Sequence, residues 1–184
     1  MIVFREHTNS GYSGRTAENA SAHITIAFAV NFLSAGEILT KKEVLKKKKT
    51  YFPVDIKESL EIPDVTITSL VKAMNSSLRG SLFDEEISVN IAGNGIYTMS
   101  SQYLQKELDD MVYLTLKRCL EHPGLKVKII QIRTGGQSGI DESGAKAGTR
   151  LGIPTLVLAP KGWKWRNALG QDVLGEEKFK SRFL

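Results

Sequence analysis

Short apolar runs rich in β-branched residues recur along the second half of the chain, with longer polar and amphipathic segments between them. The runs 86–93, 126–133 and 154–160 predict three buried strands. The segment 100–122 has apolar positions at helical spacing, and 138–152 predicts the next helix. This β-α-β-α-β order favours parallel strands that are joined by right-handed crossovers.

The first half of the chain has a less regular pattern. A polar, glycine-rich segment at 8–16 precedes an apolar run at 23–30, which predicts a further strand. Residues 38–49 predict a helix. Ser34 is placed to cap that helix, and Glu37, three residues later, would complete a capping box.

The middle and the end of the chain predict fewer regular elements. Residues 51–64 contain two prolines and are expected to be extended or irregular, while 65–80 predict a helix that ends at Gly80. We interpret 51–85 as an insertion that covers a sheet edge or forms a dimer contact. The tail, 161–184, is expected to be a loop with one short helix.

Together these elements predict a single three-layer, Rossmann-like α/β domain over residues 1–184, with a mostly parallel sheet. Its unit 86–166 carries the candidate motifs. In the last helix of that unit, Gly144 and Gly148 lie four residues apart on one face. This spacing would let the helix pack closely against the strands.

The composition is ordinary for a water-soluble protein, with 41% hydrophobic and 24% charged residues. The chain has no run of about 18 apolar residues, and its N-terminus does not resemble a signal peptide, so no membrane association is expected. Cys119 is the single cysteine, which excludes an internal disulfide. These features predict a cytoplasmic protein.

The net charge of +5 raises the question of a nucleic-acid partner. Much of the excess comes from a lysine-rich block, Lys41 to Lys49. This block lacks the interleaved aromatic residues on which single-strand binders stack bases. A solvated helix end, where cations are favoured by the helix dipole, is the preferred interpretation, and a DNA-associated function is an alternative.

Several enzyme classes lack their sequence signatures. The histidines His7, His23 and His122 are scattered, and with one cysteine they form no zinc set of usual spacing, so no metal site is expected. No Gly-x-Ser-x-Gly elbow and no Walker A motif occurs. The segment 93–98 has only the first two glycines of a dinucleotide fingerprint, which disfavours a dehydrogenase.

Each predicted strand is followed by glycine or small polar residues. The segments 31–37, 93–98, 133–141 and 160–166 occupy these positions. In an open parallel sheet, ligands bind outside the carboxyl ends of the strands, where such segments meet. We therefore expect a binding site at this edge of the sheet.

The segment Arg133 to Asp141, RTGGQSGID, is the most informative of these stretches. Gly135 and Gly136 would let backbone amides approach a ligand. Ser138 and Gly139 would open a helix whose first amides are unpaired and suit a phosphate or carboxylate. Asp141 would hold a ribose hydroxyl or favour the helix dipole. The competing interpretation is an ordinary tight turn.

These residues resemble the SLOG superfamily of Rossmann-like nucleotide-binding domains. The similarity is greatest to a group described as molybdenum-carrier proteins, which have a Gly-Gly-Gln-(Thr/Ser)-Gly-x-Asp stretch, a Leu-Gly-Ile-Pro element and a Pro-Lys-Gly element. Here these are residues 135–141, 151–154 and 160–162. The similar region covers roughly 86–166.

The resemblance implies a ligand site and a strand order. We expect a circularly permuted arrangement in which the strands follow the order 154–158, 127–132, 87–92, 24–30, with the reversal point between the last two. The ligand would lie between 93–98, 34–37 and 135–138. The ligand-binding residues implied are Arg15, Asn19, Gly93, Asn94, Gly95, Thr134, Gly135, Gly136, Gln137, Ser138, Gly139 and Lys161.

The leading expectation is a protein that binds a nucleotide or nucleotide-derived ligand, with Arg15, Arg133 or Lys161 neutralising its charge. The sequence specifies no cofactor. An alternative is a hydrolase of phosphoribohydrolase type that uses Glu37 or Asp141 as acid or base, although most of that family's catalytic loop is missing. A protein–protein module with a vestigial pocket is a further alternative. Because relatives of this kind pair, a homo-oligomer is expected.

Overall fold

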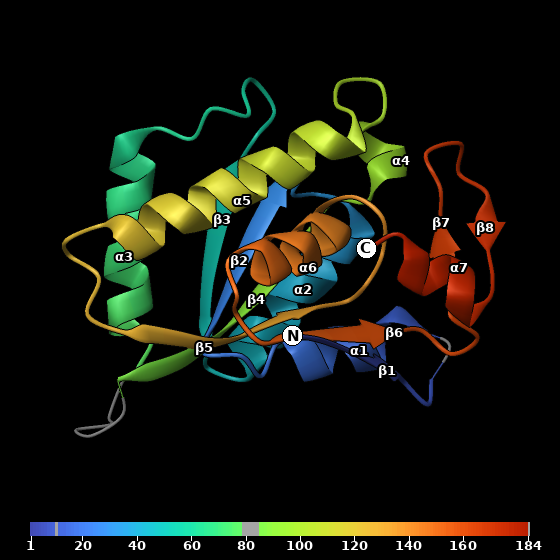
Figure 1. Ribbon diagram of the computed structural model, residues 1–184, viewed down its shortest axis with the longest axis horizontal. Helices are drawn as coiled ribbons and strands as arrows, with labels where there is room; N and C mark the ends of the chain where they lie inside the picture. Colours follow the sequence, from blue (N-terminus) through green and yellow to red (C-terminus); the bar gives the residue numbers. More distant parts are fainter. Residues whose placement is uncertain (10, 79–84, 184) are drawn as a thin grey trace.

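The computed structural model describes residues 1–9, 11–78 and 85–183 and forms three layers, with a central sheet between two layers of helices (Figure 1). In chain order the elements are β1 (Ile2–Glu6), α1 (Tyr12–Asn19), β2 (Ile24–Ala29), α2 (Ala35–Lys46), β3 (Thr50–Asp55), α3 (Asp64–Ser76), β4 (Glu86–Gly93), α4 (Ile96–Met99), α5 (Gln105–Glu121), β5 (Lys128–Thr134), α6 (Ile140–Arg150), β6 (Thr155–Ala159), β7 (Trp165–Arg166), β8 (Asp172–Val173) and α7 (Glu176–Ser181).

The central sheet has six strands in the order β1-β6-β5-β4-β2-β3, and every pair in it is parallel. The predicted order of the strands β6, β5, β4 and β2 is confirmed. β2 and β4 are hydrogen-bonded neighbours, with Ile24 opposite Val89 and Phe28 opposite Gly93. The fold is therefore the Rossmann-like α/β class that the sequence predicts.

The direction of each crossover decides which face of the sheet a helix covers. The connections from β1 to β2 and from β2 to β3 run toward the β3 edge, whereas those from β4 to β5 and from β5 to β6 run toward the β1 edge. Because such crossovers are right-handed, the two groups place their helices on opposite faces. Accordingly, α1 and α2 cover one face, and α3, α5 and α6 cover the other (Figure 1).

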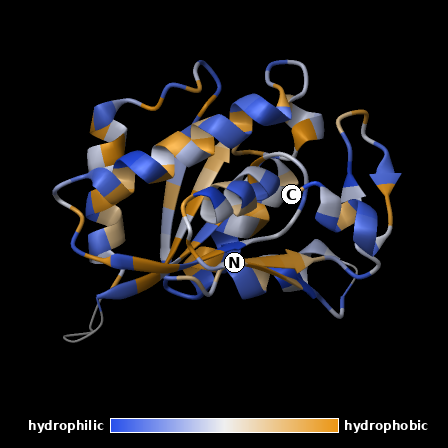
Figure 2. Ribbon diagram, in the orientation of Figure 1, coloured by the Kyte–Doolittle hydropathy of each residue, from blue (hydrophilic) through white to orange (hydrophobic). Residues whose placement is uncertain are grey.

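The core lies along the central strands, which are apolar on both faces. All residues of β2 are buried, and so are Val89 and Ile91 of β4. Figure 2 shows apolar positions concentrated along the middle of the sheet and polar positions on the outer sides of the helices. Burial on both faces is typical of parallel sheets and explains why these strands are nearly continuous apolar runs in the sequence.

Two glycines of α6 allow this helix to pack directly on the sheet. A Cβ at Gly144 would lie 2.6 Å from the Cβ of Ile91, and a Cβ at Gly148 would lie 2.3 Å from Oγ1 of Thr155. Both distances are too short for any side chain. The close packing predicted from the spacing of these glycines is confirmed.

Several elements of the described residues were not predicted as regular helices or strands. β1 is short and half exposed, so its sequence does not mark it as a strand. It is recognisable as one only from its pairing with β6. α1 lies in the segment interpreted as polar and glycine-rich. β3 forms where extended or irregular chain was expected, because an edge strand tolerates Pro53. The hairpin of β7 and β8 lies within the tail that was interpreted as a loop.

Residues 50–76 extend the sheet beyond β2 and place α3 against α5, so they belong to the same layers as the rest of the chain. The predicted helix end at Gly80 lies outside the described residues. Of the helices in the described ranges, none combines the length and apolarity that a membrane crossing requires.

We predict that Gly144→Ala destabilises the protein although alanine is the better helix former. Its methyl group would displace Ile91, and such overpacking costs about 1–3 kcal/mol. The matched change Gly36→Ala, in α2, meets no atom within 4 Å and should stabilise by up to about 1 kcal/mol. Urea denaturation measures both, and equal effects of the two changes would contradict the packing described here.

Candidate functional site

A cavity of about 330 Å³ opens at the carboxyl ends of β2 and β4. It lies at the point where the sheet order reverses, since the chain leaves β2 toward one face and β4 toward the other. Its walls come from α1, the start of α2, the end of β4 with α4, the loop after β5 and Arg166 of β7. This is the position at which open parallel sheets bind ligands.

Most of the residues that the sequence predicts for the site meet at this cavity. The predicted residues that line it are Arg15, Asn19, Glu37, Gly93, Asn94, Gly95, Gly135, Gln137, Ser138 and Asp141. The three segments expected to enclose the ligand, 34–37, 93–98 and 135–138, all contribute to its walls. Two parts of the chain that are far apart in sequence, α1 and the loop after β5, therefore meet here.

Four predicted residues do not line the cavity. Thr134 is buried, and its hydroxyl donates a hydrogen bond to the backbone oxygen of Asp141. Gly136 packs beside Phe179, and Gly139 packs against the backbone of residues 94–96. Lys161 is exposed in the loop after β6. Their positions do not support the ligand contacts that the sequence assigns to them.

Asn94 joins the ends of the two strands that frame the cavity. Its Oδ1 accepts hydrogen bonds from the backbone nitrogens of Val30 (3.0 Å) and Asn31 (2.9 Å). Its Nδ2 donates to the oxygen of Asn31 and to Oγ of Ser34. Because all of its polar atoms are used in this way, Asn94 is a structural residue that fixes the start of α2 beside the cavity.

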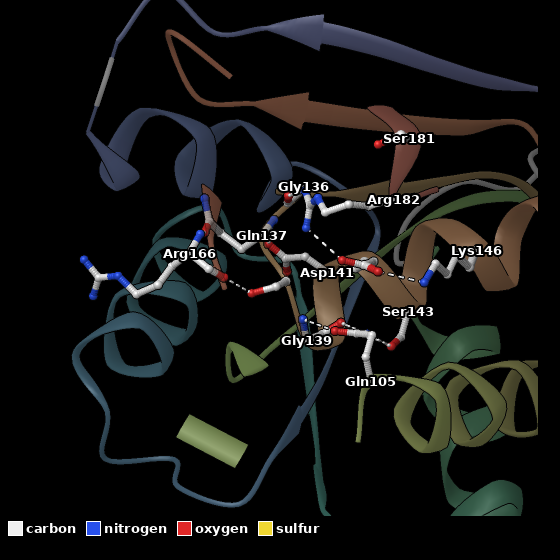
Figure 3. A network of polar contacts seen from close by, with 12 residues as sticks. Gln105, Gly136, Gln137, Gly139, Asp141, Ser143, Lys146, Arg166, Ser181 and Arg182 are labelled. Atoms are coloured by element: carbon white, nitrogen blue, oxygen red, sulfur yellow. Dashed lines mark hydrogen bonds and ion pairs between the residues drawn. The ribbon is translucent and has the colours of Figure 1, made fainter. Parts of the chain in front are cut away.

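Three amides of the glycine-rich loop and the helix start already donate to protein groups. The Gln137 nitrogen donates to Oδ2 of Asp141 (3.2 Å), and the Gly139 nitrogen donates to Oε1 of Gln105 (2.7 Å; Figure 3). The Ile140 nitrogen donates to the oxygen of Asn94. These three amides are therefore not available to a phosphate, contrary to the expectation for Gly139 and the first residue of this helix: Gln105 of α5 and Asn94 at the end of β4 supply acceptors there.

The C-terminal segment holds the same loop from the other side. Nε2 of Gln137 donates to the Lys164 oxygen (3.1 Å), and Oγ of Ser138 donates to the Arg166 oxygen. Arg182, which lies beside Gly136 in Figure 3, donates to the Gly136 oxygen (2.7 Å) and pairs with Glu142. The residues after β6 thus brace the loop and bring Arg166 to the cavity.

The two tryptophans of the C-terminal segment serve packing. Trp163 contacts the ring of Phe179, with ring centroids 5.5 Å apart, and Trp165 lies beneath the guanidinium of Arg182. Both pack against a cluster that includes Phe179 and Phe183. Neither lines the cavity, so neither is placed to stack a base in it.

Two carboxyl groups that line the cavity, those of Glu37 and Asp141, have raised pKa values. Burial and, to a smaller extent, the nearby Asp141 together raise the pKa of Glu37 to about 7, although a hydrogen bond from Tyr51 opposes the change. Burial also raises the pKa of Asp141 to about 6, against the opposing effect of Arg15. Near neutral pH, therefore, one group is largely ionised and the other is partly protonated.

Arg15 supports the loop. Its Nη1 donates to the oxygens of Gly135 and Leu158, and burial lowers the pKa of its guanidinium. A Cβ at Gly135 would lie 2.6 Å from Oδ2 of Asp141, so a larger residue here would displace this carboxylate. Arg133, the other arginine considered for charge neutralisation, pairs with Glu18 and lies outside the cavity wall.

Three buried polar atoms at the cavity have no protein partner. Six buried side-chain atoms lack a hydrogen bond among the residues that the structure describes, and three of them belong to cavity residues: Nε of Arg15, Oδ1 of Asn19 and Oδ1 of Asn90. Such atoms cost about 1–3 kcal/mol each when they are left unpaired. Their concentration at one cavity indicates that a polar ligand or water completes the site.

The sequence interpretation did not name several of the cavity residues, among them Tyr12, Asn90, Tyr97 and Arg166. Asn90 carries a recognisable signal, because it is a polar residue inside a buried apolar strand, where its Nδ2 donates to Thr25. The other three lie on elements whose position depends on tertiary packing.

Across residues 1–9, 11–78 and 85–183, no group of three or more histidine, cysteine, aspartate or glutamate side chains is arranged to hold a metal ion. Comparison with protein-family models, with curated proteins and with solved structures gives no match to this chain. The chemistry of the site must therefore be argued from its own residues.

We predict that Glu37 makes the protein less stable as the pH rises. Its pKa in the folded state, about 7, lies above the ordinary value of 4.5, so the folded state binds more protons between these values. The free energy of unfolding should then fall as the pH rises through this window.

Glu37→Gln removes this titration and keeps an acceptor for Tyr51. Between pH 5 and pH 8 the wild type should lose on the order of 2 kcal/mol more than the variant, as measured by urea denaturation. Glu58→Gln, at an exposed position, should follow the wild type. Parallel pH profiles of wild type and Glu37→Gln would show that Glu37 titrates normally.

Proposed function

We propose that the cavity binds a nucleotide or nucleotide-derived ligand. The observation that carries the proposal is the coincidence of a cavity at the reversal point of a parallel sheet with three unpaired buried polar atoms on its walls. The unpaired atoms of Arg15, Asn19 and Asn90 lower the stability of the free protein, and a polar ligand that supplies their partners would recover this cost.

The dimensions of the cavity limit the size of the ligand. Its volume of about 330 Å³ lies at the lower end of the range of small-molecule sites, which is roughly 300–1,000 Å³. A mononucleotide or nucleoside fits this range better than a dinucleotide. Exposed rings of Tyr12 and Tyr97 on the cavity wall offer surfaces on which a base can stack.

The resemblance to SLOG domains agrees with this proposal. The stretch 135–141 and the segment 93–98, which carry the resemblance, both contribute residues to the cavity wall. The lysine-rich block, by contrast, lies at the far end of α2 from the cavity, because the cavity is lined by the first turns of this helix. It does not add a nucleic-acid contact to the same site.

A second candidate is hydrolysis of an N-glycosidic bond, and the pair Glu37 and Asp141 favours it. Protonated Glu37 would donate its proton to the leaving base nitrogen as the bond from C1′ breaks. Ionised Asp141 would accept a proton from the water whose oxygen bonds to C1′. The products are the free base and the sugar, and solvent exchange restores both protonation states.

We predict that ribonucleoside 5′-monophosphates raise the melting temperature of the wild-type protein. A ligand at about a hundred times its Kd adds about 2.7 kcal/mol to the free energy of unfolding. Gly36→Leu should abolish the shift without unfolding the protein, because Gly36 lines the cavity and its Cβ direction is open.

Ser69→Leu, at an exposed position of α3 away from the cavity, serves as the matched control and should keep the full shift. The binding proposal fails if no member of the panel shifts the wild type, or if Gly36→Leu responds like the control.

If the second candidate is correct, release of free base should be fastest between about pH 6 and 7, the range set by the two carboxyl groups. Glu37→Gln should lower kcat at least about 100-fold while Kd changes little, since a general acid is lost and the cavity keeps its shape. Chromatography of the products measures this, with Glu58→Gln as control. Binding without turnover would leave a pure binding function.

A further inference from the structure

We propose that the cavity takes its ligand in one orientation, with the hydroxyls of a ribose toward the inner wall and a phosphate at the mouth beside Arg166. The cavity would then select phosphorylated ribose over its 2′-deoxy counterpart. This inference rests on the proposed function and adds to it the part of the ligand that is recognised.

The inner wall is rich in hydrogen-bond acceptors. Oδ1 of Asn19 and Oδ1 of Asn90 are unpaired, and their side chains are at least nine-tenths buried. The carboxyl groups of Glu37 and Asp141 line the same cavity. Sugar hydroxyls can donate hydrogen bonds to these acceptors. A phosphate, in contrast, would bring further negative charge close to two acidic groups.

Arg15 does not turn this acceptor-rich wall into a site for an anion. Its Nη1 is engaged by the oxygens of Gly135 and Leu158, and its charge acts on Asp141. It therefore serves to hold the loop and to balance one carboxylate. The unpaired Nε of Arg15 adds one donor to an otherwise acceptor-rich wall, which suits a hydroxyl, since a hydroxyl both donates and accepts.

Positive charge that is accessible to a ligand lies instead at the rim. Arg166 lines the cavity from the β7–β8 hairpin, and its side chain is 47% exposed. Figure 3 shows its guanidinium directed away from Asp141. Its Nε pairs with Asp172 at 3.2 Å, so the remaining donors of the guanidinium are free to face a phosphate in a forked geometry.

The hairpin that carries Arg166 is fixed to the rest of the site. The Arg166 nitrogen donates to Oε1 of Gln137, and Ser100 on the α4 side donates to the oxygen of Ala168. Gly170 packs on the ring of Tyr97. Arg166 is thus held at the rim by an element that contacts both Gln137 and the α4 side of the cavity.

Isothermal titration calorimetry with four kinds of probe tests this orientation: ribonucleoside 5′-monophosphates, their 2′-deoxy counterparts, the unphosphorylated ribonucleosides, and ribose 5-phosphate. The ribonucleotide that binds best should bind at least tenfold more tightly than its 2′-deoxy form, because loss of the hydroxyl leaves a buried acceptor unpaired. Equal affinities would overturn the inward placement of the ribose.

The variant Arg166→Met tests whether the phosphate of the ligand lies at the mouth of the cavity beside Arg166. It should weaken the 5′-monophosphate at least tenfold and leave the matching ribonucleoside unchanged. Arg150→Met is a matched control, because Arg150 is similarly exposed (46%) and is also paired with an aspartate, Asp110. If Arg166→Met weakens nucleotide and nucleoside equally, or weakens neither, the phosphate is not at this rim.

The probes also separate this inference from the function on which it rests. Binding of ribonucleotide and 2′-deoxyribonucleotide with the same affinity keeps the proposed function and overturns the orientation. Binding of ribose 5-phosphate without any nucleotide keeps the orientation and overturns the nucleotide assignment. If none of the four probes binds, both are overturned.

Discussion

The parallel pairing of β2 with β4 is the constraint on which the site depends. The two strands run in register from Ile24 opposite Val89 to Phe28 opposite Gly93, and there they stop together. Gly93 permits this ending, because a Cβ at that position would lie 2.0 Å from the Phe28 oxygen. Beyond it the chain turns to opposite faces of the sheet, and the side chain of Asn94 fixes the two exits in place.

Burying the polar groups around this cavity lowers the free energy of unfolding. Two carboxyl groups, the guanidinium of Arg15 and two asparagines are removed from water around it, and some of their atoms have no protein partner. The apolar core along β2, β4 and α5 offsets this cost. Stability and binding are therefore opposed at this point: a change that removes a buried polar group should stabilise the chain and weaken the site.

The sequence predicts the central part of the fold well because burial on both faces leaves a strong signal. The strand at 86–93 and its neighbours follow from apolar runs, whereas the order of four strands was expected from the resemblance carried by residues 86–166. β1, α1 and the β7–β8 hairpin carry no such signal, because they are half exposed and acquire their structure by contact with β6 or with the glycine-rich loop.

The sequence predicts where the candidate site lies better than it predicts which groups the site offers to a ligand. Strand-end glycines indicate where the cavity lies, but they do not reveal that Gln105 and Asp141 occupy the loop amides. That occupancy changes the expected role of the segment from an anion cradle to a support for Asp141. Arg166 was equally hidden, since only the folded C-terminal segment brings it to the cavity.

A crystal structure of the protein grown with a ribonucleoside 5′-monophosphate tests the central claim most directly. The account predicts electron density for the nucleotide between α1, the start of α2 and the end of β4, within hydrogen-bond distance of Asn90. Density for the nucleotide at any other surface, with this cavity filled only by water, would contradict it.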